Sequence, residues 1–91
     1  MRIAFDPNKN AANKAKHGVS LALARQVLAD PKRIDILDIR FDYDEERIIA
    51  YCRHRGRIWV CVYTIRGETY RIISLRKANA RETKRYFETH R

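Results

Sequence analysis

Three strand-like runs follow one another in residues 47–75, RIIAYCRHRGRIWVCVYTIRGETYRIISL. Each run is rich in β-branched and aromatic residues, and the interruptions at residues 54–56 and 66–68 have the length of hairpin turns. Strands that are joined by such short turns lie antiparallel. The middle run, Arg57–Ile65, is apolar at both alternating sets of positions, so we expect both of its faces to be covered. This segment therefore predicts the centre of an antiparallel sheet.

Helix signals lie on both sides of this segment. Asp6 can cap a helix that Pro7 begins, and Gly18 suits its left-handed end. We expect an α+β domain over residues 1–91, an antiparallel meander with two N-terminal helices on one face and one C-terminal helix across part of the other. Besides the three central strands, the predicted elements are a strand Arg2–Phe5, a helix Pro7–His17, a helix from Ser20 to Asp30, a strand Ile34–Phe41 and a last helix from Asn79 to about His90.

Charge is the unusual feature of the composition. The 91 residues carry 20 basic and 11 acidic side chains, a net charge of +9, and 14 of the basic residues are arginine. Acid is concentrated in residues 29–46, whereas residues 47–91 hold twelve basic and three acidic side chains. Because an arginine fork matches two phosphate oxygens, this composition favours a polyanionic partner, most often nucleic acid. The alternative is a cationic surface that serves only solubility.

Several classes of protein and site are not expected. No run approaches 18 apolar residues, and the chain begins without the apolar stretch of a secretory signal, so we expect a cytoplasmic protein with no membrane span. Cys52 and Cys61 lie in strand-like runs without zinc-site spacing, which predicts core thiols rather than a disulfide. The acidic segment Asp38–Glu46 lacks the spacing of a two-metal site, so we expect neither a metal nor another cofactor.

Both ends of the chain resemble the BrnT-type toxins. The opening matches in Phe5-Asp6-Pro7 with Lys9, Asn13, Lys16-His17-Gly18-Val19 and Ala29-Asp30-Pro31, and the close in residues 71–78, RIISLRKA, with Glu82 and Tyr86. The resemblance covers essentially the whole chain and implies a type II toxin, an endoribonuclease of RelE-like fold that cleaves RNA and arrests translation. It also implies a BrnA-type ribbon-helix-helix antitoxin, bound in a hetero-oligomer that contacts operator DNA only through the antitoxin.

RNA cleavage without a metal requires a base for the 2′-hydroxyl, a cation for the phosphate and an acid for the departing 5′-oxygen. The candidate catalytic residues are His17, Arg76, Glu82 and Tyr86. Each of three has a structural alternative, since His17 can close the first helix, Glu82 can complete the cap on Asn79, and Tyr86 can pack on the sheet.

Further basic side chains are candidates for binding the RNA phosphates. They lie on the first helix, at the hairpin turns and along the last strand: Lys9, Lys16, Arg53, Arg55, Arg57, Arg66, Arg71 and Lys77. Arg71 and Arg76 are an odd number of residues apart, so they serve one site only if the strand twists or bulges. Two other functions remain open, a non-catalytic RNA- or DNA-binding module and a protein-interaction domain for an acidic partner.

Overall fold

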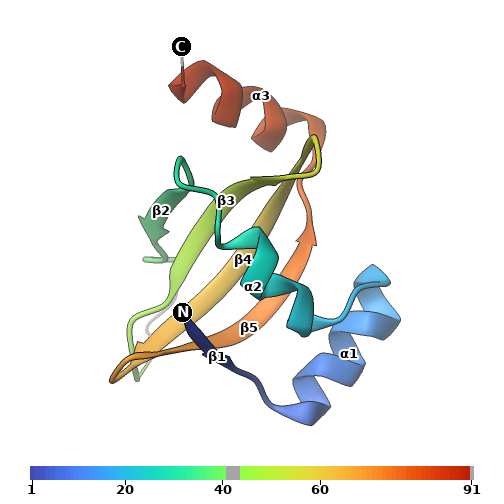
Figure 1. Ribbon diagram of the computed structural model, residues 1–91, viewed down its shortest axis with the longest axis vertical. Coiled ribbons are helices and arrows are strands. Elements are labelled where there is room, and N and C mark those ends of the chain that lie inside the picture. The colour runs from blue at the N-terminus through green and yellow to red at the C-terminus, as the bar shows by residue number, and fades with distance from the viewer. Residues whose placement is uncertain (41–43, 91) are drawn as a thin grey trace.

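The computed structural model describes residues 1–40 and 44–90, which form an α+β fold (Figure 1). Its strands are β1 (Arg2–Ala4), β2 (Ile34–Leu37), β3 (Ile48–His54), β4 (Arg57–Arg66) and β5 (Thr69–Lys77). Its helices are α1 (Pro7–His17), the 3-10 turn η1 (Leu21–Leu23), α2 (Ala24–Val27) and α3 (Ala80–Thr89). The α+β class that the sequence predicts is confirmed.

Short-range interactions define the ends of the helices as predicted. The Asp6 carboxylate accepts a hydrogen bond from the backbone N–H of Asn8 at 2.7 Å, and Gly18 ends α1 with φ 73°. Asn79 and Glu82 form a full capping box at the start of α3, because each side chain accepts from the other residue's backbone N–H. These ends stand where the sequence predicts them.

The sheet is mixed, and this corrects the predicted antiparallel meander. Across the described residues it has five strands in the order β1-β5-β4-β3-β2. Strands β2 to β5 do form an antiparallel meander, but β1 lies parallel to β5, with Arg2 opposite Thr69. The sequence of a three-residue strand does not indicate which strand it will pair with. In the structure β1 pairs with the outer edge of β5.

The second N-terminal helix and the strand after it are also shorter than predicted. Between Ser20 and Asp30 the chain forms only the 3-10 turn η1 and the single helical turn α2. This short segment is enough to bury Leu21, Ala24 and Val27 completely. Strand β2 ends at Leu37, and Phe41, where the predicted strand ended, lies outside the described residues, as do residues 42 and 43 of the acidic segment.

The two faces of the sheet differ in what covers them. On one face η1 and α2 pack against the core residues Ala50, Cys61 and Leu75, which are fully buried (Figure 1). The opposite face holds the register row Ile34–Tyr51–Val60–Arg76, and α3 lies at its end; we call it the α3 face. Helical segments thus lie on both faces, as predicted, but the predicted pair of N-terminal helices is not matched exactly, because α1 lies along the edge of β5, where Asn13 binds Leu75. Both cysteines are buried free thiols, as expected, and Trp59 is also buried.

Candidate functional site

A β-bulge in β5 brings two of the predicted arginines onto one face. Val60 pairs with Arg76 and Thr64 pairs with Arg71, so four steps along β4 match five steps along β5. The register shifts between Val62 and Tyr63, where β5 contains an extra residue. Arg71 and Arg76 therefore both lie on the α3 face, although their odd spacing would separate them on a regular strand.

Arg76 is held by a two-pronged ion pair with Glu82. Its Nη1 and Nη2 atoms donate to Oε1 and Oε2 of Glu82, each at 2.8 Å. The same carboxylate also accepts from the Asn79 N–H at 2.9 Å, so Glu82 completes the helix cap and binds Arg76 at once. The Arg76 guanidinium lowers the pKa of Glu82, and Glu82 in turn raises the pKa of Arg76, so both groups are charged at neutral pH.

His17 is the last residue of α1, and it lies close enough to Arg76 for the charge of the guanidinium to act on it. One turn earlier, the buried Asn13 amide binds both backbone groups of Leu75, at 2.8 and 3.1 Å, and so fixes α1 beside β5. Partial burial, with the positive charges of Lys16 and Arg76, lowers the pKa of His17 below its ordinary value of 6.5. The imidazole is therefore neutral at pH 7 and able to accept a proton.

Tyr86 binds Asp30 through its hydroxyl group. Its hydroxyl donates to Oδ2 of Asp30 at 2.6 Å, and the Arg53 N–H donates to the same oxygen at 2.8 Å. Burial and this hydrogen bond raise the pKa of the Tyr86 phenol. The side chain, which is 4% exposed, thus attaches α3 to the segment after α2.

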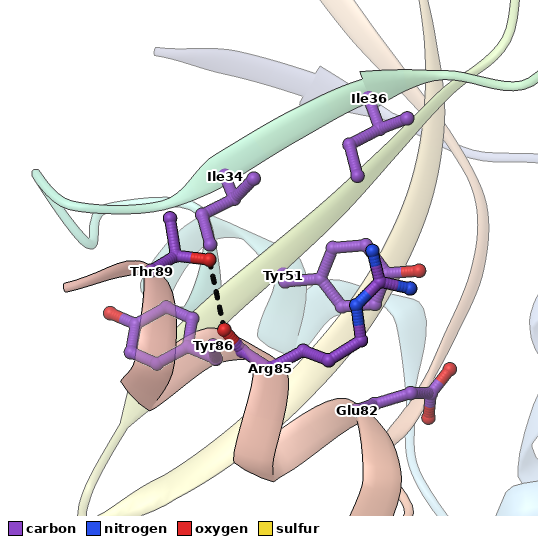
Figure 2. A pocket seen from close by; sticks show the side chains of 7 residues that line it. All are labelled: Ile34, Ile36, Tyr51, Glu82, Arg85, Tyr86 and Thr89. Carbon is purple, nitrogen blue, oxygen red and sulfur yellow. Dashed lines mark hydrogen bonds between the residues drawn. The ribbon is translucent and has the colours of Figure 1, made fainter.

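A small recess on the α3 face lies between α3, β2 and β3. It is lined by Ile34, Ile36, Tyr51, Glu82, Arg85, Tyr86 and Thr89 (Figure 2). Its volume of about 60 Å³ is far below the roughly 300–1,000 Å³ of small-molecule pockets, so it suits an extended ligand that crosses the surface.

Sequence reasoning missed Tyr51 and Arg85 as site residues. The available signals were the spacing of Arg85, three residues after Glu82 on one helix, and the alternation along β3 that turns Tyr51 away from the core.

The remaining predicted phosphate contacts divide between the two ends of the sheet. Arg55 and Arg57 belong to the β3–β4 hairpin, at the same end as Arg76, and Arg53 lies over the Phe87 ring at 5.6 Å. Lys9 and Lys16 are exposed on α1, and Lys77 is exposed beside Arg76. At the other end, Arg66 pairs with Glu45 through two contacts of 3.2 Å, and the charge of Arg71 also acts on Glu45.

The described part of the chain shows neither a cluster of metal ligands nor a membrane-spanning helix. Within residues 1–40 and 44–90 no group of three or more His, Cys, Asp or Glu side chains is placed to hold a metal ion. In the same residues no helix is both long and apolar enough to cross a membrane.

Fold and site together define a small cationic α+β domain in which an arginine and a carboxylate form an ion pair at one end of a sheet, and the charge of that arginine acts on a nearby imidazole. The chain belongs to the family described as the ribonuclease toxin BrnT of type II toxin–antitoxin systems, whose model matches residues 5–82. The match includes His17, Arg76 and Glu82 and ends before Arg85 and Tyr86. The resemblance seen in the sequence is thereby confirmed, and the family makes this chain a ribonuclease toxin. No curated protein matches the chain.

Proposed function

We propose that the protein is a metal-independent endoribonuclease with a RelE-like fold that cleaves RNA in the cytoplasm and so arrests translation. The observation that carries the proposal is the joint placement of Arg76, Glu82 and His17 at one end of the sheet. The family supports ribonuclease activity, and His17 and Arg76 supply the base and the cation that cleavage by the RNA's own 2′-hydroxyl needs, while Glu82 holds Arg76 in place.

In the proposed reaction the 2′-oxygen bonds to phosphorus and the bond from phosphorus to the 5′-oxygen breaks. Neutral His17 accepts the proton of the 2′-hydroxyl, and water protonates the departing 5′-oxygen. Arg76 neutralises the charge that grows on the phosphate, after the phosphate has replaced Glu82 as its partner. Glu82 holds the guanidinium in place before the substrate binds, and Tyr86 positions α3, and with it Glu82, through Asp30.

The other cations bind the flanking RNA in this proposal. Lys16, Lys77 and the hairpin arginines Arg53, Arg55 and Arg57 extend the phosphate path at the Arg76 end, and Lys9 lies further along α1. Arg66 and Arg71 act at the far end of the sheet, where a longer RNA would reach Arg71 on the α3 face. Binding through such contacts falls steeply with salt.

The proposed antitoxin is of the BrnA type, with a ribbon-helix-helix domain that alone contacts operator DNA. We infer that it forms a hetero-oligomer with the toxin and inhibits it by covering Arg53–Arg57 and Arg76. A complex that is inactive and yet leaves these side chains fully open would contradict the inference.

The test is incubation of purified protein with defined RNA, with and without chelator, and identification of both new ends. We expect cleavage in either case, with a 2′,3′-cyclic phosphate and a 5′-hydroxyl at the ends. Arg76→Ala should reduce kcat on the order of 100- to 1,000-fold, as loss of a transition-state donor does elsewhere. Arg2→Ala is the matched control, since Arg2 is exposed and pairs at the opposite end of β5.

Loss of cleavage in chelator would contradict metal independence, and normal cleavage by Arg76→Ala would contradict the assigned site. Salt-sensitive RNA binding that never produces new ends would instead favour the non-catalytic module.

A further inference from the structure

The recess beside the proposed scissile phosphate has an aromatic floor. Tyr51 lies in the same register row as Arg76, with only Val60 between them, and its side chain is half-buried on the α3 face. Figure 2 shows the Arg85 side chain reaching from α3 toward Tyr51, with Ile34 and Ile36 on the neighbouring strand. An aromatic ring, a guanidinium and two aliphatic side chains thus meet next to Arg76.

We propose that Tyr51 and Arg85 form a stacking site for one unpaired nucleobase of single-stranded RNA, adjacent to the phosphate that Arg76 binds. The proposal rests on the proposed function, because Arg76 sets the position of the phosphate. It adds the base next to that phosphate as the part of the substrate that the protein recognises.

Chemistry favours a base over other occupants of the recess. Unpaired bases stack on tyrosine rings and on arginine planes, and their faces are apolar enough to cover the neighbouring aliphatic side chains Ile34 and Ile36. Ile36 is 44% exposed although it is a large aliphatic residue, so this side of the recess is open to a ligand. Arg76 and Arg85 match the negative charge of the adjoining phosphates.

The geometry also limits how the base binds. A recess of about 60 Å³ cannot enclose a base, so the base must lie flat across it with its edges toward solvent. Contacts to a flat face are sequence-tolerant, whereas hydrogen bonds to base edges specify the sequence. This site therefore distinguishes unpaired from paired RNA, and any base preference it gives comes from stacking strength.

The test compares two uncleavable hexanucleotides of 2′-O-methyl RNA that have the same number of phosphates, one with bases and one fully abasic. Their affinity ratio isolates the contribution of the bases, because the phosphate contacts are the same in both. In Tyr51→Leu, which keeps an apolar side chain without an aromatic plane, we expect this ratio to fall on the order of ten-fold. Tyr51→Phe is the matched control and should keep the ratio.

An unchanged ratio in Tyr51→Leu, with its thermal unfolding like that of the wild type, overturns the proposal. Weaker inhibition by the antitoxin together with an unchanged ratio also overturns it and assigns the recess to the antitoxin. If the wild type cleaves no RNA while the ratio still depends on Tyr51, the base site stands and the nuclease proposal fails. If the wild type cleaves RNA and the affinity ratio is the same in Tyr51→Leu, the nuclease proposal stands and the base site fails.

Discussion

Asn13→Ala tests whether one buried side chain holds α1 against the sheet. The Asn13 amide is 6% exposed and donates to the carbonyl oxygens of Val19 at 2.9 Å and of Leu75 at 2.8 Å. Its Oδ1 atom accepts from the Leu75 N–H at 3.1 Å. Because β1 pairs only with residues 69–71 of β5, this amide takes the place of a neighbouring strand further along the edge.

The magnitude follows from what alanine leaves behind. A hydrogen bond contributes about 0.5–1.5 kcal/mol net, and a buried backbone group without a partner costs about 1–3 kcal/mol. Asn13→Ala removes three bonds and leaves both polar groups of Leu75 unpaired in a buried position. We therefore expect the free energy of unfolding to fall by about 3 kcal/mol, which for a domain of this size lowers Tm by roughly 12–24 °C.

Urea and thermal unfolding followed by circular dichroism measure this loss. Asn8→Ala is the matched control, because Asn8 is an exposed asparagine in the first turn of the same helix and should change stability by about 0.5 kcal/mol or less. A loss below about 1 kcal/mol in Asn13→Ala, or one equal to the control, would refute the view that this amide attaches α1 to β5.

Three further predictions concern stability. Glu82→Gln should be less stable than the wild type at pH 7, and the difference in stability should shrink in acid. Because the pKa of Glu82 is lowered by folding, its stabilisation is complete above the ordinary pKa of 4.5 and is lost as the pH falls through the pKa of the folded state. A constant difference in stability between pH 7 and pH 3 would contradict the ion pair. Tyr86→Phe should cost about 1.5 kcal/mol in urea unfolding, because Asp30 loses a charge-assisted bond but keeps two backbone donors. Gly18→Ala should cost about 1 kcal/mol through backbone strain alone, because φ is 73° and no atom beyond the adjoining residues lies within 4 Å of the added methyl. A neutral effect in thermal unfolding would show that the helix end relaxes.

The ends of the helices and the β3–β4 turn could be predicted because they depend on residues that are close together in the sequence. The cap on α1, its left-handed end at Gly18 and the capping box at Asn79 each depend on residues within four positions of one another. The β3–β4 hairpin is of the same kind, since Arg55 and Gly56 both have positive φ in its two-residue turn. Such features can be read from sequence because the interacting groups are neighbours in every conformation of the chain.

The candidate site was only partly predictable. Arg76 and Glu82 are six residues apart, and the sequence indicated both, but it did not indicate that one carboxylate serves the cap and the arginine together. The bulge that turns Arg71 toward the Arg76 side of the sheet depends on the register of β4 against β5. Tyr51 comes next to Arg76 only through two successive strand pairings.

Charge, helix caps, hairpin order and family membership thus follow from the linear chain, because each is a property of composition or of residues close together along it. Folding alone settles which strand lies beside β5, how Asn13 reaches Leu75 across 62 residues, and why Tyr86 binds Asp30 across 56. These contacts form only when packing of the core brings together segments that are far apart in the sequence. A local sequence pattern therefore cannot indicate them.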